Sequence, residues 1–333
     1  MSESRPVITV LRPSDPDSPA HEPPGLEQIS DRADIRLTDA DHIVEDIAGS
    51  DALFLWDFFS GALQKAWPSA DRLKWIHVAA AGVDKLLFDE LNDSDVMVTN
   101  AQGIFDRPIA EWVLGAVLAE AKDFAGNYRL KTTKTWDHRE TKRVQGSRAM
   151  VIGTGAIGRE IARLLSAVGI EVTGAGRTER ENDEDFGVVV PSETLEEHIG
   201  DYDIIVNAAP LTPATTGLIG ATTLAAMKPG AHLINIGRGA SVDQQALVAA
   251  LHDGPLGFAS LDVFDEEPLP QDSDLWGLEN VMIAAHMSGD VHGWRDSLAE
   301  LFIDNAQRWL DGKDLVNVVD KDKGYVPGKR SAS

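Results

Sequence analysis

Three polar residues occupy positions where chemistry is possible: Arg238, Glu267 and His286 each follow a predicted apolar strand. In an open α/β sheet, the carboxyl ends of the strands form the rim of the ligand crevice. An arginine there can bind a carboxylate through two parallel hydrogen bonds, and a carboxylate beside a histidine favours the proton-donating imidazolium. These residue types indicate proton transfer to a small bound acid. A structural histidine and an arginine paired with a nearby acid remain the alternatives, and His292, in a glycine-rich loop, is the competing histidine.

A glycine-rich unit must lie beside these residues. An apolar strand over 149–152 leads into Gly153, Gly155 and Gly158, an amphipathic helix follows, and a second strand covers 170–173. This unit has the ~30 residues of a dinucleotide-binding strand-helix-strand motif. The first glycine allows the tight turn, the second allows close approach of a pyrophosphate, and the third lets helix and strand pack. The free N–H groups of the helix N-terminus favour a phosphate.

The end of the second strand bears on cofactor choice. NAD sites usually carry an acid there, which accepts hydrogen bonds from the ribose, but this chain has Gly176 followed by Arg177 and Thr178. Arginine pairs with a 2′-phosphate through charge-assisted hydrogen bonds, and Arg180 is a second candidate cation within the polar segment 179–187, which is predicted to be a loop. The sequence therefore predicts preference for NADPH, unless Arg177 only stacks on adenine or faces solvent beside neighbouring glutamates.

Alternating strands and helices predict two doubly wound parallel-sheet domains. A small one lies before residue 100 and a larger one surrounds the glycine-rich unit. A long helix is expected over 104–122, and the charged stretch 123–147, with Tyr128 and Trp136, is expected to be an arm or surface helix for a partner subunit. Further strands are expected over these ranges: 7–11, 33–37, 52–56, 73–78, 96–99, 188–190, 202–207, 232–236, 257–261 and 281–285.

Composition narrows the class of protein. The 333 residues suggest two domains, and the absence of cysteine excludes disulfides, thiolate metal sites and a cysteine nucleophile. A net charge of −24 opposes binding to nucleic acid or anionic membranes. No apolar run predicts a signal peptide or a membrane span, so a cytoplasmic protein is expected. No bound metal is expected either. The excess of acidic residues indicates either an ordinary well-solvated surface or an adaptation to high salt.

Several stretches in combination resemble the D-isomer-specific 2-hydroxyacid dehydrogenase family, and its glyoxylate and hydroxypyruvate reductases in particular. The resemblance covers roughly residues 50–315. The matching stretches are AAAGVD at 79–84, TNAQGIFDRPIAEWVLG at 99–115, GTGAIG at 153–158, APLTPATTGLI at 209–219, NIGRGASVDQQALVAAL at 235–251, LDVFDEEPLP at 261–270 and AAHMSG at 284–289.

The resemblance implies a Rossmann-type cofactor domain, residues 102–289, inserted in a flavodoxin-like substrate domain, residues 1–101 and 290–333. It implies that Arg238 binds the substrate, that His286 is the acid/base with Glu267 as its partner, and that Asp262 contacts the nicotinamide carboxamide. The expected substrate-binding residues are Ala81, Gly82, Val83, Arg238 and His286. The expected cofactor-binding residues are Gly153, Thr154, Gly155, Ala156, Ile157, Gly158, Arg177, Thr178, Ala209, Pro210, Thr215, Ile236 and Asp262.

The function expected from residues and resemblance together is NAD(P)-dependent reduction of a small 2-oxoacid, with NADP(H) preferred and NAD(H) as the alternative cofactor. A homodimer is expected because family members are usually dimers. One alternative is a formate or phosphite dehydrogenase, although formate members place glutamine where Glu267 stands. Another is a nucleotide-sensing corepressor built on the same fold. The sequence does not identify which 2-oxoacid is the substrate.

Overall fold

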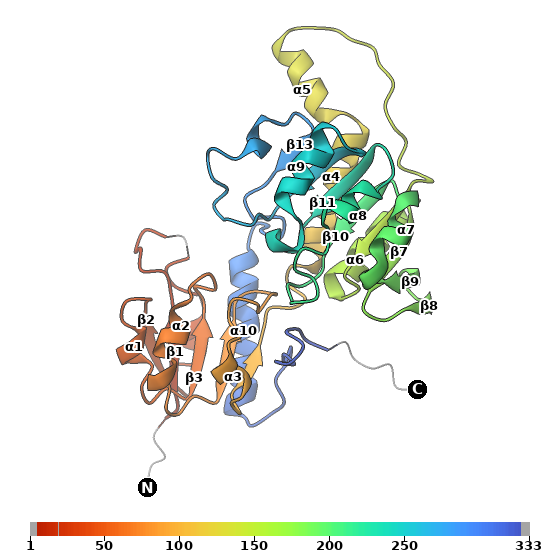
Figure 1. The fold of residues 1–333 in the computed structure, drawn as a ribbon. Helices are drawn as coiled ribbons and strands as arrows, with labels where there is room; N and C mark the ends of the chain where they lie inside the picture. Colours follow the sequence, from red (N-terminus) through yellow and green to blue (C-terminus); the bar gives the residue numbers. More distant parts are fainter. Residues whose placement is uncertain (1–4, 19, 328–333) are drawn as a thin grey trace. The chain divides into compact units, whose positions relative to one another are not determined.

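The computed structural model describes residues 5–18 and 20–327. The chain divides into two compact units, Met1–Ile104 with Val291–Ser333, and Phe105–Asp290. These boundaries fall after residues 104 and 290, against the expected 101 and 289. Each unit is built on its own sheet (Figure 1).

The first unit contains a five-stranded parallel sheet with the strand order β2-β1-β3-β4-β5. This is the flavodoxin-like order. β3 and β4 are buried along their whole length, as expected for parallel strands covered on both faces. Its strands are β1 (Val7–Leu11), β2 (Asp34–Thr38), β3 (Ala52–Leu55), β4 (Trp75–Val78) and β5 (Met97–Thr99). Its helices are α1 (Ile43–Asp46), α2 (Ala62–Ala66), α3 (Asp89–Asn92) and α10 (Trp294–Leu310).

The C-terminal segment belongs to this first unit. Phe302 of α10 stacks on Phe54 of β3, with ring centroids 3.8 Å apart, and both side chains are fully buried. Farther on, the backbone N–H of Val319 donates to the carbonyl oxygen of Val98 at 2.8 Å. The last part of the chain therefore completes the core that the first hundred residues begin.

The second unit contains an eight-stranded sheet with the order β13-β12-β11-β10-β6-β7-β9-β8. All of its pairings are parallel except β8 with β9. The six strands from β9 to β12 follow the Rossmann order, with the direction of winding reversing between β6 and β10. Its strands are β6 (Arg148–Ile152), β7 (Glu171–Gly176), β8 (Arg180–Asp183), β9 (Gly187–Pro191), β10 (Ile204–Asn207), β11 (Ala231–Asn235), β12 (Leu256–Leu261) and β13 (Val281–Ile283).

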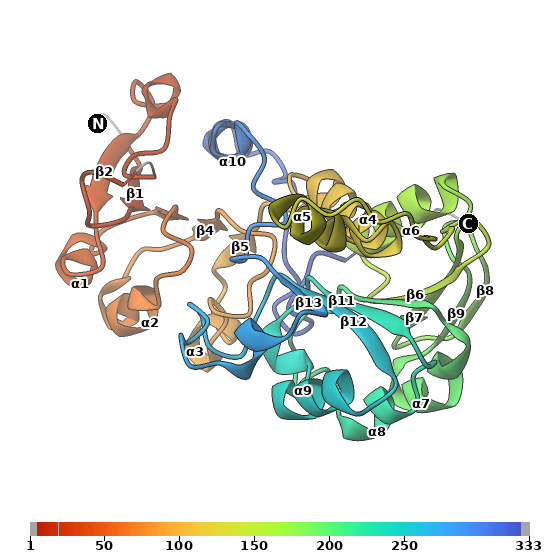
Figure 2. The same ribbon diagram turned by 90° about the horizontal axis from the view of Figure 1, so that it is seen from above.

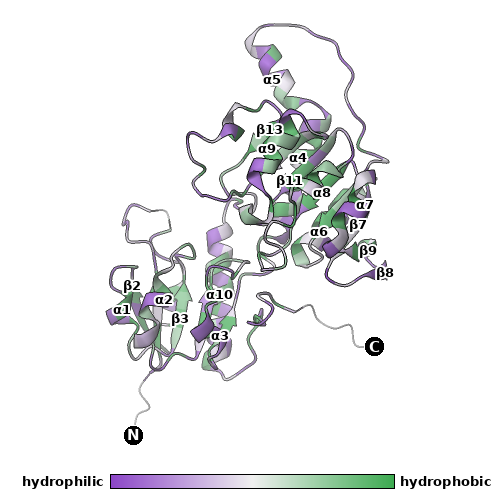
Figure 3. Ribbon diagram, viewed as in Figure 1, coloured by the Kyte–Doolittle hydropathy of each residue, from purple (hydrophilic) through white to green (hydrophobic). Residues whose placement is uncertain are grey.

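Helices cover both faces of this second sheet (Figure 2). α4 and α6 lie on one face, and α7, α8 and α9 lie on the other. The central strands are hydrophobic, whereas the segment that returns from α5 to β6 is largely hydrophilic (Figure 3). The helices are α4 (Asp106–Ala121), α5 (Phe124–Thr132), α6 (Ala156–Ala167), α7 (Leu195–His198), α8 (Ala221–Ala225) and α9 (Gln244–His252).

The fold class predicted from the sequence is confirmed, but one local prediction is wrong. The segment 179–187 is not a loop: residues Arg180–Asp183 form β8, which pairs antiparallel with β9. β8 lies at the edge of the sheet and its sequence, Arg-Glu-Asn-Asp, contains no apolar residue. It therefore carries neither the apolar run nor the alternation by which strands are recognised.

Candidate active site

The side chains of His286 and Glu267 contact each other in the second unit. Nδ1 of His286 lies 2.8 Å from Oε2 of Glu267. The other carboxylate oxygen, Oε1, accepts a hydrogen bond from the backbone N–H of Phe264 at 3.0 Å. One glutamate therefore bridges the segments that follow β12 and β13. Because this contact engages Nδ1, proton exchange with a substrate would use Nε2 of the same ring.

The backbone of His286 has a special conformation. Its φ is 52°, in the left-handed region, which few non-glycine residues adopt. Its backbone N–H donates to the carbonyl oxygen of Asp262 at 2.9 Å. Such conformations persist where surrounding contacts hold them, and they cluster at functional sites. The contacts that hold this one come from Asp262.

The side chain of Asp262 clamps the two residues after His286. Its carboxylate accepts hydrogen bonds from the backbone N–H of Met287 at 2.8 Å, from that of Ser288 at 3.1 Å, and from the Ser288 hydroxyl. Asp262 itself is buried. The sequence led us to expect a contact between Asp262 and nicotinamide. This role in holding the histidine loop was missed, because nothing in the sequence links the two segments.

Arg238 lies on the loop after β11, next to the strand that leads to Glu267. Its Nη1 donates to the carbonyl oxygen of Gly237 at 2.8 Å, and its carbonyl oxygen accepts hydrogen bonds from Asn235 Nδ2 at 3.1 Å and from the Ser241 hydroxyl at 2.5 Å. At Gly239 a Cβ atom would lie only 1.9 Å from the carbonyl carbon of Phe264. Only glycine therefore allows this close approach of the arginine loop to the segment carrying Glu267.

The glycine-rich turn has the geometry that a dinucleotide needs. Gly153 has a φ of 100°, and a Cβ there would lie 2.6 Å from the carbonyl oxygen of Ala208. A Cβ at Gly158 would lie 1.9 Å from the carbonyl oxygen of Gly153. Gly155, in contrast, faces open space, with nothing within 4 Å of its Cβ position, and it is the N-cap of α6. The open position at a helix N-terminus is where a pyrophosphate fits.

Several other expected cofactor residues begin α6 or follow strands β10 and β11 of the same sheet. Ala156 and Ile157 begin α6, and Ile236 follows β11. Ala209 and Pro210 follow β10. The hydroxyl of Thr215 donates to the Pro210 carbonyl oxygen at 2.6 Å and accepts from the backbone N–H of Thr212 at 2.8 Å, so this side chain closes its own turn.

The residues after β7 also lie where the sequence analysis expected them. Arg177 and Thr178 are exposed directly after the strand. Arg180 lies in β8, and its Nη2 donates to the hydroxyl of Thr154 in the glycine-rich turn at 3.0 Å. The structure therefore joins Arg180 and Thr154, whose proximity the sequence did not predict.

In the first unit, the turn after β4 carries the predicted substrate-binding residues. Asn100 holds this turn through a hydrogen bond from Nδ2 to the carbonyl oxygen of Ala81 at 2.6 Å. Across the described residues, the backbone N–H groups of Gly82 and Val83 donate to no protein acceptor. Two adjacent unpaired N–H groups are suited to an anion.

Residues 5–18 and 20–327 contain no group of three or more His, Asp and Glu side chains arranged to hold a metal ion. The same part of the chain contains no helix long and apolar enough to cross a membrane.

Comparison with known proteins identifies the family. Residues 114–288 match the model of the D-isomer specific 2-hydroxyacid dehydrogenase, NAD binding domain. The chain belongs to the D-isomer-specific 2-hydroxyacid dehydrogenase family. Among similar dehydrogenases, the hydroxyphenylpyruvate reductase of Plectranthus scutellarioides is 32% identical over 78% of this chain and 82% of its own length. The glyoxylate reductase of Thermococcus litoralis is 32% identical over 76% of this chain and 79% of its own.

A solved dehydrogenase structure supports the same assignment. The D-isomer specific 2-hydroxyacid dehydrogenase from Xanthobacter autotrophicus Py2, in complex with NADPH and MES, is 28% identical, with a TM-score of 0.79. The match covers 97% of this chain and 100% of that one. The family predicted from the sequence is thus confirmed, and the chain is an oxidoreductase that uses a nicotinamide dinucleotide.

Proposed function

We propose that this protein reduces a small 2-oxoacid to the 2-hydroxyacid and prefers NADPH as the cofactor. The observation that carries the proposal is the pairing of His286 with Glu267 at 2.8 Å, beside the loop of Arg238. An acid/base histidine oriented by a carboxylate, with a cation nearby, is the set that carbonyl reduction requires. Relatives named as glyoxylate and hydroxyphenylpyruvate reductases support it.

Three side chains act in the proposed mechanism, together with the bound dinucleotide. The bound dinucleotide supplies the hydride that reduces the carbonyl carbon. Protonated His286 gives the proton on Nε2 to the carbonyl oxygen as negative charge develops there, so the product is a neutral hydroxyl. Glu267 holds the ring and stabilises the imidazolium before transfer. Arg238 binds the substrate and stabilises charge on its oxygen.

The substrate carboxylate is proposed to bind the backbone N–H groups of Gly82 and Val83. Both groups lack a protein acceptor within the described residues. Asn100 holds this turn at Ala81, and the side chain of Val83 is buried. A carboxylate bound by fixed N–H groups gains charge-assisted hydrogen bonds without ordering long side chains.

The proposed cofactor preference rests on the end of β7. Gly176 carries no acid that would repel a 2′-phosphate, and Arg177 and Thr178 are exposed next to it. In the Xanthobacter relative the bound cofactor is NADPH. The same family membership supports a cytoplasmic location, because nicotinamide dinucleotides are intracellular metabolites.

We also propose that the protein is a homodimer. Tyr128 and Trp136, on α5 and the segment after it, are 70% and 98% exposed. Large exposed aromatic side chains on one arm are suited to a subunit interface. Light scattering should give a mass about twice the 36.0 kDa of one chain, and a mass near that of one chain at assay concentration would refute the dimer.

The activity is tested by following oxidation of the reduced cofactor with glyoxylate, pyruvate and hydroxypyruvate, each with NADPH and with NADH. We expect turnover of at least one of the three acids, and faster reduction with NADPH. As a comparison, reduction of NADP⁺ and NAD⁺ is followed with formate and with phosphite. Oxidation of either compound without reduction of any oxoacid would contradict the proposed reaction.

A further inference from the structure

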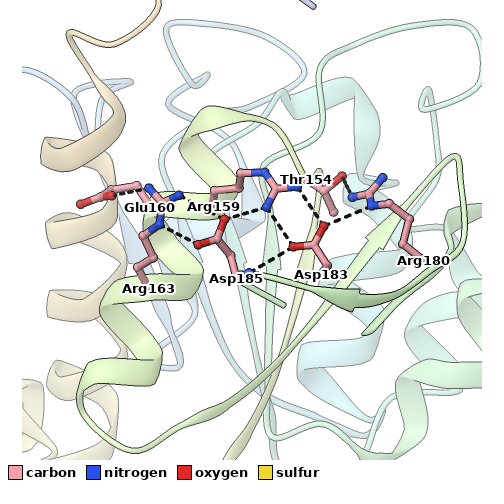
Figure 4. Close-up of polar contacts among 7 residues, drawn as sticks. All are labelled: Thr154, Arg159, Glu160, Arg163, Arg180, Asp183 and Asp185. Carbon is pink, nitrogen blue, oxygen red and sulfur yellow. Dashed lines mark hydrogen bonds and ion pairs between the residues drawn. The ribbon is translucent and has the colours of Figure 1, made fainter. Parts of the chain in front are cut away.

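A cluster of three arginines and two aspartates joins α6 to the β8–β9 hairpin (Figure 4). Arg159 and Arg163 come from α6, Arg180 and Asp183 come from β8, and Asp185 lies in the turn to β9. A cation–π contact also holds the turn, because the guanidinium carbon of Arg159 lies 5.4 Å from the centroid of the buried Phe186 ring. None of these contacts belongs to the catalytic residues described above.

The carboxylate of Asp183 is saturated with hydrogen bonds. Oδ1 accepts from Arg159 Nη1 at 2.9 Å and from the backbone N–H of Asp185 at 3.1 Å. Oδ2 accepts from Arg159 Nη2 at 2.9 Å and from Arg180 Nε at 3.1 Å. A carboxylate has about four acceptor positions, and all four are used. Asp183 therefore has no acceptor left for a ribose hydroxyl, although it is an acid close to the end of β7.

The surroundings keep Asp183 ionised. The hydrogen bonds from Arg159 hold the pKa of Asp183 well below its usual range, against the opposing effect of burial, and its side chain is only 6% exposed. A permanent negative charge at this buried point can hold two guanidinium groups in fixed positions.

Arg180 is thereby fixed across the glycine-rich turn. Its Nε donates to Asp183, and its Nη2 donates to the hydroxyl of Thr154 at 3.0 Å. Thr154 packs on two glycines of β7. A Cβ at Gly174 would lie 3.0 Å from the Thr154 side chain, and one at Gly176 would lie 3.2 Å from it. This is the end of the second Rossmann strand, where the adenosine ribose of a dinucleotide lies.

Arg180 keeps donors for a ligand. A guanidinium has five N–H donors, and across the described residues Arg180 uses two of them. A phosphate beside the turn could accept from the remaining donors in the bidentate manner that arginine favours. Because Asp183 and Thr154 already hold the side chain, little conformational freedom would be lost on binding.

We propose that Asp183 is a positioning residue that fixes Arg180 beside the glycine-rich turn to bind a 2′-phosphate, and so sets selectivity for NADPH. The inference rests on the proposed function in one respect, the binding of a dinucleotide at the glycine-rich turn. It assigns to a buried aspartate the opposite of the usual role of an acid in this region: Asp183 favours the 2′-phosphate instead of the ribose hydroxyls.

Isothermal titration with adenosine 2′,5′-bisphosphate and with 5′-AMP tests the proposal without catalysis. The two probes differ by the 2′-phosphate alone. The wild type should bind the bisphosphate more tightly than 5′-AMP. Asp183→Asn should weaken binding of the bisphosphate roughly tenfold, the scale of a hydrogen bond to a charged group, and should leave binding of 5′-AMP within about twofold.

Asp185→Asn is the matched control, because Asp185 contacts Arg159 and Arg163 but not Arg180. It should leave the ratio of the two affinities unchanged. The double variant Asp183→Asn/Arg180→Ala should lose no more affinity for the bisphosphate than Arg180→Ala alone, because a positioning residue acts through its partner. Circular dichroism establishes that each variant is folded.

Three results would overturn the inference while leaving the dinucleotide site in place. One is an equal loss for both probes in Asp183→Asn, which would indicate general damage to the site. Another is additive losses in the double variant. The third is a wild type that binds the two probes equally, and this result would leave 2-oxoacid reduction with NADH standing. A wild type that binds neither probe would overturn the dinucleotide site itself, and the inference with it.

Discussion

Nδ1 of His286 lies 2.8 Å from Oε2 of Glu267, while the second oxygen of that carboxylate is held by the backbone N–H of Phe264. The carboxylate therefore has a fixed position before any ligand binds. A fixed partner orients the imidazole ring. This arrangement sets the expectations for the two residues of the pair.

Replacement of His286 by alanine should lower turnover in oxoacid reduction by ~10²-fold or more, the usual scale of general acid/base catalysis. Cofactor affinity should change little, because His286 is expected to act on the substrate. His292→Ala is the control: this histidine is exposed, and its loss should leave turnover near that of the wild type. Steady-state kinetics and cofactor titration check both variants, and the reverse pattern would mean that His292 is the catalytic histidine.

Glu267→Ala should lower turnover in oxoacid reduction roughly tenfold or more, because it removes the partner that holds Nδ1 of His286, and a hydrogen bond to a charged group is worth ~1.5–3 kcal/mol. Glu266→Ala changes an exposed neighbouring acid and should leave turnover near that of the wild type. Steady-state kinetics measure both variants, and full turnover in Glu267→Ala would show that this carboxylate does not position His286.

Asp262→Ala should destabilise the protein, because it removes the acceptor of two backbone N–H groups in the histidine loop. Each group left unpaired away from water costs ~1–3 kcal/mol. Ser288→Ala removes only the hydroxyl donor and leaves both backbone contacts in place, so its effect on the free energy of unfolding should be smaller. Urea unfolding followed by fluorescence measures the difference. Equal effects of the two substitutions would argue against the clamp.

Arg177→Ala should raise the KM for NADPH sharply and leave that for NADH nearly unchanged. Arg177 is exposed directly after β7, and its guanidinium can pair with a 2′-phosphate, which NADH lacks. Kinetics with both cofactors at saturating oxoacid give the two values. Equal losses with both cofactors, or equal use of both by the wild type, would reject the assignment.

The sequence predicted the fold well where strands are parallel and buried. Such strands are largely continuous apolar runs, and Ile204–Asn207, which is buried throughout, is an example. The glycine spacing at 153–158 was equally informative, because close backbone contacts at Gly153 and Gly158 exclude every other residue type. The fold class was confirmed by the structure, and the family by the comparison with known proteins. The roles of Arg238, Glu267 and His286 remain predictions, although the structure pairs two of them.

Contacts between distant polar residues could not be predicted. Asp262 and Ser288 are joined by the register of β12 and β13, which no periodicity encodes. Likewise, Arg180 was only a candidate cation within a segment predicted to be a loop. Its contact with Thr154 depends on an antiparallel hairpin whose strand is entirely polar.

That polar strand also determines how the sheet ends. β8 is the last strand on its side, and an exposed edge offers unpaired N–H and C=O groups to any other chain. Its four residues include three charged side chains, and its register with β9 shifts between Glu181 and Asp183. Both features oppose the addition of a further strand. The hairpin therefore disfavours edge-to-edge strand pairing between copies of this sheet.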